Sequence, residues 1–208
     1  MITTNTAWEE AQNWEQWWHS NCINSLNEEI KQLVYADKMG LARTPDNKTP
    51  YRFDLQNKKI LDIGGGAYSL LLKCANIGEG STVVDPLMDR HPEWVRMRYK
   101  ELGVEALAMT GEDVNFEGFD EVWIYNVLEH VYDPEKIAKN ARRAGKVVRV
   151  FEWVDTVQNI GHPQVLTEEK LNNWFGGEGK VEQLASAGCF GKAWHGVFKG
   201  DSYDSLSD

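Results

Sequence analysis

The sequence predicts an α/β fold in which helices cover both faces of a parallel sheet. Residues 59–66 (KILDIGGG) have the pattern of a short buried strand that ends in a glycine turn. Residues 82–85 (TVVD) have the pattern of a second buried strand, which ends in a carboxylate. Between residues 59 and 154, apolar runs of strand length alternate with segments of helical periodicity. Since such alternation is typical of strand–helix–strand units, it predicts a doubly wound sheet.

Cap and turn residues place the elements along this part of the chain. Asp133 followed by Pro134 is a typical helix start, and Gly145 ends the same helix. Thr167 is a typical cap for a later helix. The predicted strands are 59–63, 81–85, 104–109, 120–125, 146–154, 180–186 and 192–199. The predicted helices are 67–76, about 92–102, 134–144 and 167–175.

Two further helices are predicted before the sheet region. The first carries Trp14, Trp17 and Trp18 at helical spacing, and the second ends at Gly40. Residues 41–58 are polar and read as a connector. The tryptophans indicate either packing on the core or an aromatic lid over a cleft.

The glycine turn and the carboxylate after the second strand together predict a bound nucleoside. Glycines let a backbone approach a ligand without an intervening Cβ, and Asp85 at a strand tip can accept both hydroxyls of a ribose. Asp62 precedes the glycines, where an anion repels phosphate and suits a cationic ligand. S-adenosylmethionine, which has a sulfonium and no phosphate, therefore fits better than a nicotinamide dinucleotide. A glycine turn without a ligand is the alternative interpretation.

Composition favours a globular protein of the cytoplasm that does not bind nucleic acid. The 208 residues suffice for one α/β domain, and the net charge of −10 repels polyanions. Three cysteines without a Cys-x-x-Cys pair indicate reduced thiols. The first residues lack the pattern of a signal peptide, and no apolar run is long enough to span a membrane.

Four motifs in register resemble the class I S-adenosylmethionine-dependent methyltransferases, in the type 11/12-like branch. The motifs are LDIGGG (61–66), VVDP (83–86), GEDVNF (111–116) and FDEVWIYNVLEHVYDP (119–134). The resemblance implies a Rossmann-like sheet of seven strands in the order 3-2-1-4-5-7-6, with strand 7 antiparallel.

The resemblance also implies how the chain is divided. Residues 58–200 would form the methyltransferase domain. Residues 1–57 would be an N-terminal helical cover and connector, and residues 201–208 a flexible tail.

Carried over to this sequence, the family's motifs imply a set of residues that bind the cofactor. The methionine part is assigned to Asp62, Gly64 and Gly66, and the ribose to Asp85. The adenine is assigned to Leu87, Glu112 and Asp113, and Asn126 would cap the cofactor from the tip of strand 4. Tyr68 stands where the family usually has a third glycine, so its ring is expected to shape the methionine pocket.

Two histidines are candidates for the chemical step. His130 follows the strand 4 tip, and an imidazole suits proton removal at neutral pH. His162 lies after strand 5, where the fold builds its acceptor pocket, and is the second candidate. The residues expected to bind the acceptor are Trp17, Trp18, Glu129 and His162.

A divalent metal ion is not expected in this protein. Asn126, Glu129 and His130 coincide with positions where some quinone-pathway members of the family bind such an ion. Asn126, however, replaces a carboxylate of that pattern.

The sequence thus predicts a methyltransferase that acts on a hydroxyl of a small molecule, such as a sugar or sugar nucleotide. The alternatives are a nucleic-acid or protein methyltransferase and a module that binds S-adenosylmethionine without catalysis. The protein is expected to be a monomer or a homodimer without a membrane partner.

Overall fold

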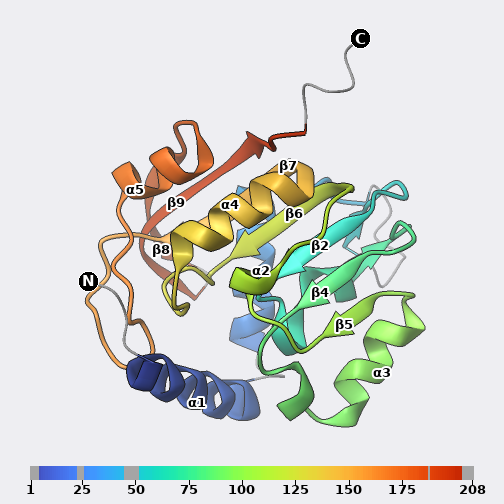
Figure 1. Ribbon diagram of the computed structural model, residues 1–208, viewed down its shortest axis with the longest axis horizontal. Coiled ribbons are helices and arrows are strands. Elements are labelled where there is room, and N and C mark those ends of the chain that lie inside the picture. Colours follow the sequence, from blue (N-terminus) through green and yellow to red (C-terminus); the bar gives the residue numbers. More distant parts are fainter. Residues whose placement is uncertain (1–4, 23–25, 45–51, 187, 203–208) are drawn as a thin grey trace.

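A computed structural model describes residues 5–22, 26–44, 52–186 and 188–202. The chain builds a seven-stranded sheet in the order β5-β4-β2-β6-β7-β9-β8, together with a small two-stranded sheet (Figure 1). The seven strands are β2 (Ile60–Ile63), β4 (Thr82–Val84), β5 (Glu105–Leu107), β6 (Phe119–Tyr125), β7 (Gly145–Trp153), β8 (Lys180–Ser186) and β9 (Cys189–Lys199). In chain order these are strands 1 to 7, so the predicted order 3-2-1-4-5-7-6 is confirmed.

The strand directions also follow the prediction. β2, β4, β5, β6 and β7 pair in parallel, whereas β9 runs antiparallel to both β7 and β8. The carboxyl ends of β2, β4 and β6 therefore meet at one edge of the sheet, which is where ligands bind in open α/β folds.

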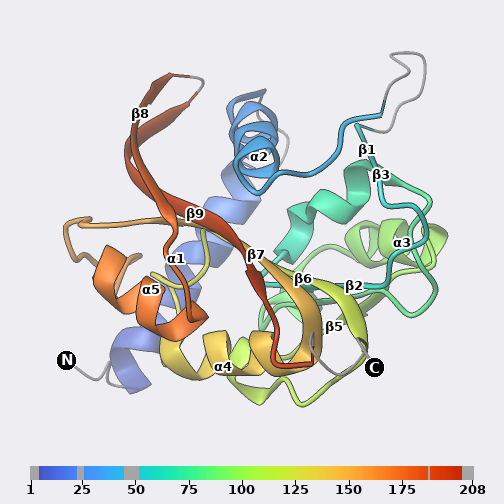
Figure 2. The same ribbon diagram turned by 90° about the horizontal axis from the view of Figure 1, so that it is seen from above.

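Two layers of apolar side chains separate the sheet from its helices. One contains residues of α2 (Leu26–Lys38) and α3 (Glu93–Glu101), and the other contains residues of α4 (Pro134–Ala144) and α5 (Glu168–Phe175). Figure 2 shows α2 and α4 on opposite faces of the sheet. None of the helices within the described ranges is long and apolar enough to cross a membrane.

The start of α4 illustrates how local sequence sets an element. The Asp133 side chain accepts a hydrogen bond from the backbone N–H of Lys136, and Pro134 occupies the first turn. Ile137, Ala138 and Ala141 then face the core on one side of the helix. The predicted bounds 134–144 agree with the structure.

The helix predicted over residues 67–76 is wrong. The chain instead forms two short 3₁₀ turns, η1 (Gly66–Tyr68) and η2 (Leu70–Lys73), followed by β3 (Cys74–Ala75). β3 pairs in parallel with β1 (Phe53–Asp54), so part of the predicted connector is also a strand. Residues 45–51 of that connector and 203–208 of the predicted tail lie outside the described residues.

A buried group of hydroxyls explains why no α-helix follows the glycines. Ser69 has an extended ψ of 137°, and its hydroxyl donates to Asp62. Tyr99 accepts from the backbone N–H of Ser69, and Tyr125 accepts from that of Leu70. Because these hydroxyls satisfy the backbone N–H groups, the segment needs no helical carbonyl partners.

Tyr125→Phe is expected to destabilise the fold by about 1–3 kcal/mol, because it leaves buried polar groups without a partner. The Tyr125 hydroxyl donates to Asp62 Oδ2 at 2.6 Å and accepts from Leu70 N at 2.9 Å. Urea unfolding measures the change. Tyr132→Phe is the matched control, because Tyr132 is exposed. Equal unfolding free energies for Tyr125→Phe and the native protein would contradict this account of the turn.

Candidate functional site

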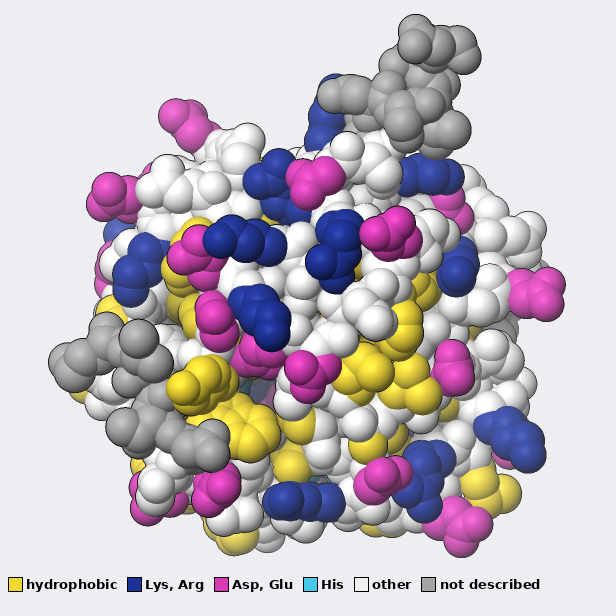
Figure 3. Space-filling model, viewed as in Figure 1, with side chains coloured by type: hydrophobic (Ala, Val, Ile, Leu, Met, Phe, Trp, Pro, Cys, Tyr) yellow, Lys and Arg dark blue, Asp and Glu magenta, His cyan; other side chains and the backbone are white. Residues whose placement is uncertain are grey.

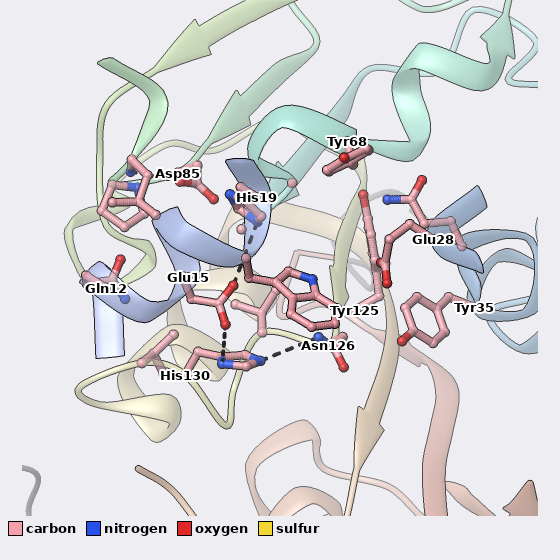
Figure 4. Close-up of a pocket in the computed structure, with 18 of the residues that line it drawn as sticks. Gln12, Glu15, His19, Glu28, Tyr35, Tyr68, Asp85, Tyr125, Asn126 and His130 are labelled. Carbon is pink, nitrogen blue, oxygen red and sulfur yellow. Dashed lines mark hydrogen bonds and ion pairs between the residues drawn. The ribbon is translucent and has the colours of Figure 1, made fainter. Parts of the chain in front are cut away.

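A cavity of about 140 Å³ lies at the carboxyl ends of β2, β4 and β6, beneath two N-terminal helices. α1 (Asn5–Cys22) crosses its mouth and α2 forms one wall. Figure 4 shows side chains of both helices reaching toward the strand tips. The lining residues are Gln12, Glu15, Trp18, His19, Glu28, Lys31, Gln32, Tyr35, Gly64, Gly65, Tyr68, Asp85, Pro86, Leu87, Tyr125, Asn126, Val127, His130 and Val131.

The glycine turn forms a backbone surface at the floor of the cavity. Gly64 has φ +78°, and a Cβ there would lie 2.5 Å from a methyl group of Val127. Gly66 has φ +52°, and a Cβ there would lie 3.2 Å from Asp85 Oδ2. A side chain at either position would be strained by the positive φ, and one at Gly66 would also fill the space in front of Asp85. The two glycines are therefore suited to the close approach of a ligand.

Asp85 stands at the tip of β4, opposite the turn. Its Oδ1 accepts a hydrogen bond from the backbone N–H of Leu87 at 2.8 Å, while Oδ2 faces the glycines. Burial raises the pKa of Asp85, although His19 and the Leu87 N–H oppose that shift. Burial makes hydrogen-bond donors from a ligand valuable to this carboxylate.

Asp62 does not lie on the cavity wall. It is fully buried behind the turn, where Ser69 and Tyr125 donate to its Oδ2. Burial raises the pKa of Asp62 to about 7 despite these two bonds. The sequence-based expectation placed this carboxylate against the ligand. In the structure Asp62 is not among the residues that line the cavity, and its Oδ2 holds the turn through Ser69 and Tyr125.

Glu112 and Asp113 also lie away from the cavity wall. Glu112 Oε1 accepts from the backbone N–H groups of Tyr132 and Asp133, so it fixes the segment before α4. Asp113 accepts from the hydroxyl of Thr110. These contacts fix the two side chains in the ligand-free protein, and their contact with the adenine stays a prediction.

His130 is held by acceptors on one ring nitrogen. Its Nδ1 lies 2.7 Å from the carbonyl oxygen of Gly161 and 3.0 Å from Glu15 Oε1. Burial alone would lower the pKa of His130, but the charge and hydrogen bond of Glu15, followed by Glu129 and Gly161, raise it to about 9. At neutral pH this ring therefore carries two protons, and base action requires the release of the proton on Nε2.

Glu129 and His162 complete a polar group around His130. Glu129 Oε1 lies 3.6 Å from His130 Nε2 and 3.7 Å from His162 Nε2, and the three residues bring ligand-type atoms within 4.8 Å. Asn159 accepts from the backbone N–H groups of Gly161 and His162. Its amide nitrogen therefore faces His162 Nδ1 at 3.2 Å, which places the proton of His162 on Nε2.

A metal ion at this group would have to displace that proton, because a histidine binds a metal through the lone pair of a ring nitrogen. The geometry is that of hydrogen-bonding groups around a histidine. That the protein works without a metal ion stays a prediction.

The tryptophans of α1 divide between the cavity and the outer surface. Trp18 lines the cavity, whereas Trp17 stacks on Trp14 at 5.1 Å and is 53% exposed. Trp14 in turn lies against Gly161. Figure 3 shows hydrophobic side chains gathered beside a hollow, above the position of α1 in Figure 1. Of the two predicted substrate-binding tryptophans, only Trp18 therefore reaches the cavity.

Several residues of the site come from the N-terminal helices and were missed by motif reasoning. Glu15 and His19 of α1 enter the cavity, and Gln32 and Tyr35 of α2 are buried with unpartnered oxygens. Glu15 and His19 are four residues apart, on one helical face with Trp18, so helical spacing offered a signal. The docking of these helices depends on tertiary packing and carries no local motif.

The sheet has the strand order of the class I methyltransferase fold, and the glycine cradle and Asp85 lie at the edge where ligands bind in open α/β folds. Residues 61–147 match a family model described as a methyltransferase domain. This match covers less than half of the chain, and it agrees with the fold and with the resemblance to class I S-adenosylmethionine-dependent methyltransferases. A search of curated protein sequences finds no match.

Solved structures share the fold at low sequence identity. The N-methyltransferase NodS from Bradyrhizobium japonicum WM9, in complex with S-adenosyl-L-homocysteine, is 18% identical with a TM-score of 0.59. The alignment covers 97% of this chain and 100% of NodS. Magnesium protoporphyrin IX methyltransferase (ChlM) from Synechocystis PCC 6803, with bound SAM, is 10% identical with a TM-score of 0.53 and coverages of 95% and 86%.

A third structure, a SAM-dependent methyltransferase from Aquifex aeolicus, is 15% identical with a TM-score of 0.51. The alignment covers 84% of this chain and 100% of that protein. The neighbours named here include enzymes with different acceptors, so the shared fold leaves the acceptor open.

Proposed function

We propose that this protein transfers a methyl group from S-adenosylmethionine to a small-molecule acceptor. The observation that carries the proposal is the glycine cradle facing the buried Asp85 carboxylate across one cavity. The turn 64–68 (GGGAY) has no basic side chain that would hold a pyrophosphate. Lys31 on the cavity wall belongs to α2 and forms an ion pair with Glu28 at 2.8 Å.

The lining residues suggest how the cofactor would be held. Asp85 would accept the ribose hydroxyls, and Leu87 would pack on the adenine. Gly64 would admit the methionine part beside Tyr68, and Asn126 would lie over the cofactor from the tip of β6. When bound, S-adenosylmethionine supplies a methyl group on a sulfonium, which is the electrophile for an in-line transfer. The protein's task is then to align donor and acceptor and to remove a proton.

The cover must rearrange when a ligand of this size binds. The cavity of about 140 Å³ is smaller than the roughly 300–1,000 Å³ of pockets that enclose such ligands. His19 of α1 occupies part of the space, because its ring would lie 3.1 Å from a Cβ at Gly66. We therefore expect α1 to shift outward with His19 as the cofactor enters, and to close again over it.

The acceptor is proposed to be a hydroxyl of a small molecule such as a sugar. His130 lies on the cavity wall beyond Asn126, where it would meet the acceptor. Trp18 of α1 also lines the cavity and offers an aromatic ring, and aromatic faces suit sugar rings. His162 would contact the acceptor from the loop that touches His130, and Glu129 lies buried between the two rings.

The protein is expected to bind S-adenosylmethionine and S-adenosylhomocysteine, and not NAD. The glycine turn exposes its backbone to the cavity, and Asp85 can accept the ribose hydroxyls. The turn has no basic side chain that would hold the pyrophosphate of NAD. Isothermal titration calorimetry with the three ligands measures the affinities. Tighter binding of NAD than of S-adenosylhomocysteine would overturn the proposed function. Transfer of radioactive methyl to candidate acceptors then separates an enzyme from a module that only binds the cofactor.

A further inference from the structure

An ion pair joins the cover helix to the candidate base. Glu15 comes from α1, more than one hundred residues before His130 in the sequence, yet its Oε1 lies 3.0 Å from His130 Nδ1. Both side chains are largely buried, with exposed fractions of 19% and 11%. Figure 4 shows the contact reaching from α1 across the cavity to His130.

We propose that Glu15 is a positioning residue for His130, and that the base of the reaction is assembled only when α1 covers the cofactor. This inference rests on the proposed methyl transfer. Glu15 and the Gly161 carbonyl both face Nδ1. They hold the proton on Nδ1 and aim Nε2 toward Asn126 Nδ2, at 3.4 Å, and Glu129 Oε1, at 3.6 Å.

A carboxylate is needed here because the methyl donor is a cation. A sulfonium bound in this cavity would place a positive charge near His130, which lines the cavity. A nearby positive charge disfavours an imidazolium and weakens the histidine as a base. Glu15 offsets this effect from the other side of the ring. A pKa that is high in the empty protein, and lower beside the sulfonium, would bring His130 into the range of a useful base.

Other charged groups around His130 do not take over the role of Glu15. Glu129 is nearest to Nε2, at 3.6 Å, and shares its Oε1 with His162 at 3.7 Å. Glu152 of β7 is fully buried and accepts from two backbone N–H groups, and burial raises its pKa to about 8. Glu15 is thus the carboxylate that meets Nδ1 directly.

α2 contributes a paired charge to the cavity. Lys31 of α2 is neutralised by Glu28 at 2.8 Å and lies over the ring of Trp18. His19 of α1 lies 3.7 Å from the second oxygen of Glu15, so Glu15 contacts both His19 of the cover helix and His130. A movement of α1 would therefore change the electrostatic environment of His130 chiefly through Glu15 and His19, which α1 carries.

The proton balance of the step is simple. The acceptor O–H gives its proton to His130 Nε2 as its oxygen bonds to the methyl carbon, and the carbon–sulfur bond breaks. The electron pair of that bond stays on sulfur, so the sulfonium charge disappears as the imidazolium charge appears. Glu15 stabilises that imidazolium, while the Nδ1 proton stays in place.

Nuclear magnetic resonance titration of the histidine rings tests the proposal without an acceptor. The His130 signals are assigned by their loss in His130→Gln. In Glu15→Gln, the midpoint of His130 is expected to fall by at least one pH unit, a tenfold loss of proton affinity. Glu10→Gln on the exposed side of the same helix is the matched control and should leave the midpoint unchanged. Glu15→Asp keeps the charge and should give an intermediate midpoint.

The His130 midpoint should also be lower with S-adenosylmethionine than with neutral S-adenosylhomocysteine. A native midpoint in folded Glu15→Gln would overturn the proposal. If that variant fails to fold, a Glu15→Asp midpoint below that of the native protein supports it, and a native midpoint overturns it. The titration of the free protein does not depend on cofactor binding. Failure of the native protein to bind S-adenosylhomocysteine would instead contradict the proposed function.

Discussion

Replacing Asp85 by alanine is expected to weaken binding of S-adenosylhomocysteine at least about tenfold without unfolding the protein. The carboxylate would accept both ribose hydroxyls, and each charge-assisted hydrogen bond is worth roughly 1.5–3 kcal/mol. Since about 1.4 kcal/mol corresponds to a tenfold change in affinity, the loss of even one bond is measurable by calorimetry. Asp85→Asn, which keeps an acceptor but loses the charge, should have a smaller effect.

Asp89→Ala is the matched control for this prediction. Asp89 lies four residues further along the chain, and its exposed carboxylate pairs with Arg96 at 3.1 Å. The affinity of this variant should equal that of the native protein. An unchanged dissociation constant in Asp85→Ala would mean that the carboxylate at the tip of β4 does not meet the ligand.

Replacing His130 by glutamine is expected to lower turnover by about 10²–10⁴, the range for the loss of a general base. Glutamine preserves hydrogen bonding toward Glu15 and Gly161 but cannot take up a proton at neutral pH. Affinity for S-adenosylhomocysteine should stay nearly unchanged, because His130 would act on the acceptor side. Steady-state kinetics with an acceptor found by screening, together with calorimetry, separate the two effects.

Full turnover in His130→Gln would place the base elsewhere. His162 is then the next candidate, since its ring lies 4.8 Å from that of His130. Burial lowers the pKa of His162, so this histidine is the more readily deprotonated of the pair. A reaction that proceeds by proximity alone would leave both single variants active.

The sheet was predictable because its signals are local. Runs such as residues 60–63 and 119–125 are rich in apolar residues and of strand length, and Asp133-Pro134 marks the start of α4. The glycine turn was predictable for the same reason, since residues adjacent in sequence set its geometry. These motifs place Gly64 and Asp85 on the cavity wall, and their contact with the cofactor stays a prediction.

The segment after the glycines was not predictable in the same way. Its apolar residues fit a helix, but hydroxyls of Tyr99 and Tyr125 take the backbone N–H groups of Ser69 and Leu70. These partners lie 30 and 55 residues away in the sequence. A tertiary hydrogen bond thus overrides the local preference for a helix.

The contribution of the cover helix α1 to the site was also not predictable from local sequence. No sequence motif around Glu15 indicates a function, and its contact with His130 forms only when α1 packs over the strand tips. Asp62 is the opposite case, because its motif predicted contact with the ligand. In the structure the carboxylate is buried behind the turn, where Ser69 and Tyr125 donate to it. Local patterns name candidates, and packing decides which side of the backbone each one faces.

A crystal structure of the protein with S-adenosylhomocysteine tests the central claim most directly. We expect both ribose hydroxyls within hydrogen-bond distance of the Asp85 carboxylate and the amino-acid part beside the glycine turn. The sulfur should face the side of the cavity formed by Asn126 and His130, with Glu15 still on His130 Nδ1. A ligand bound outside this cavity, or one whose ribose lies away from Asp85, would contradict the account.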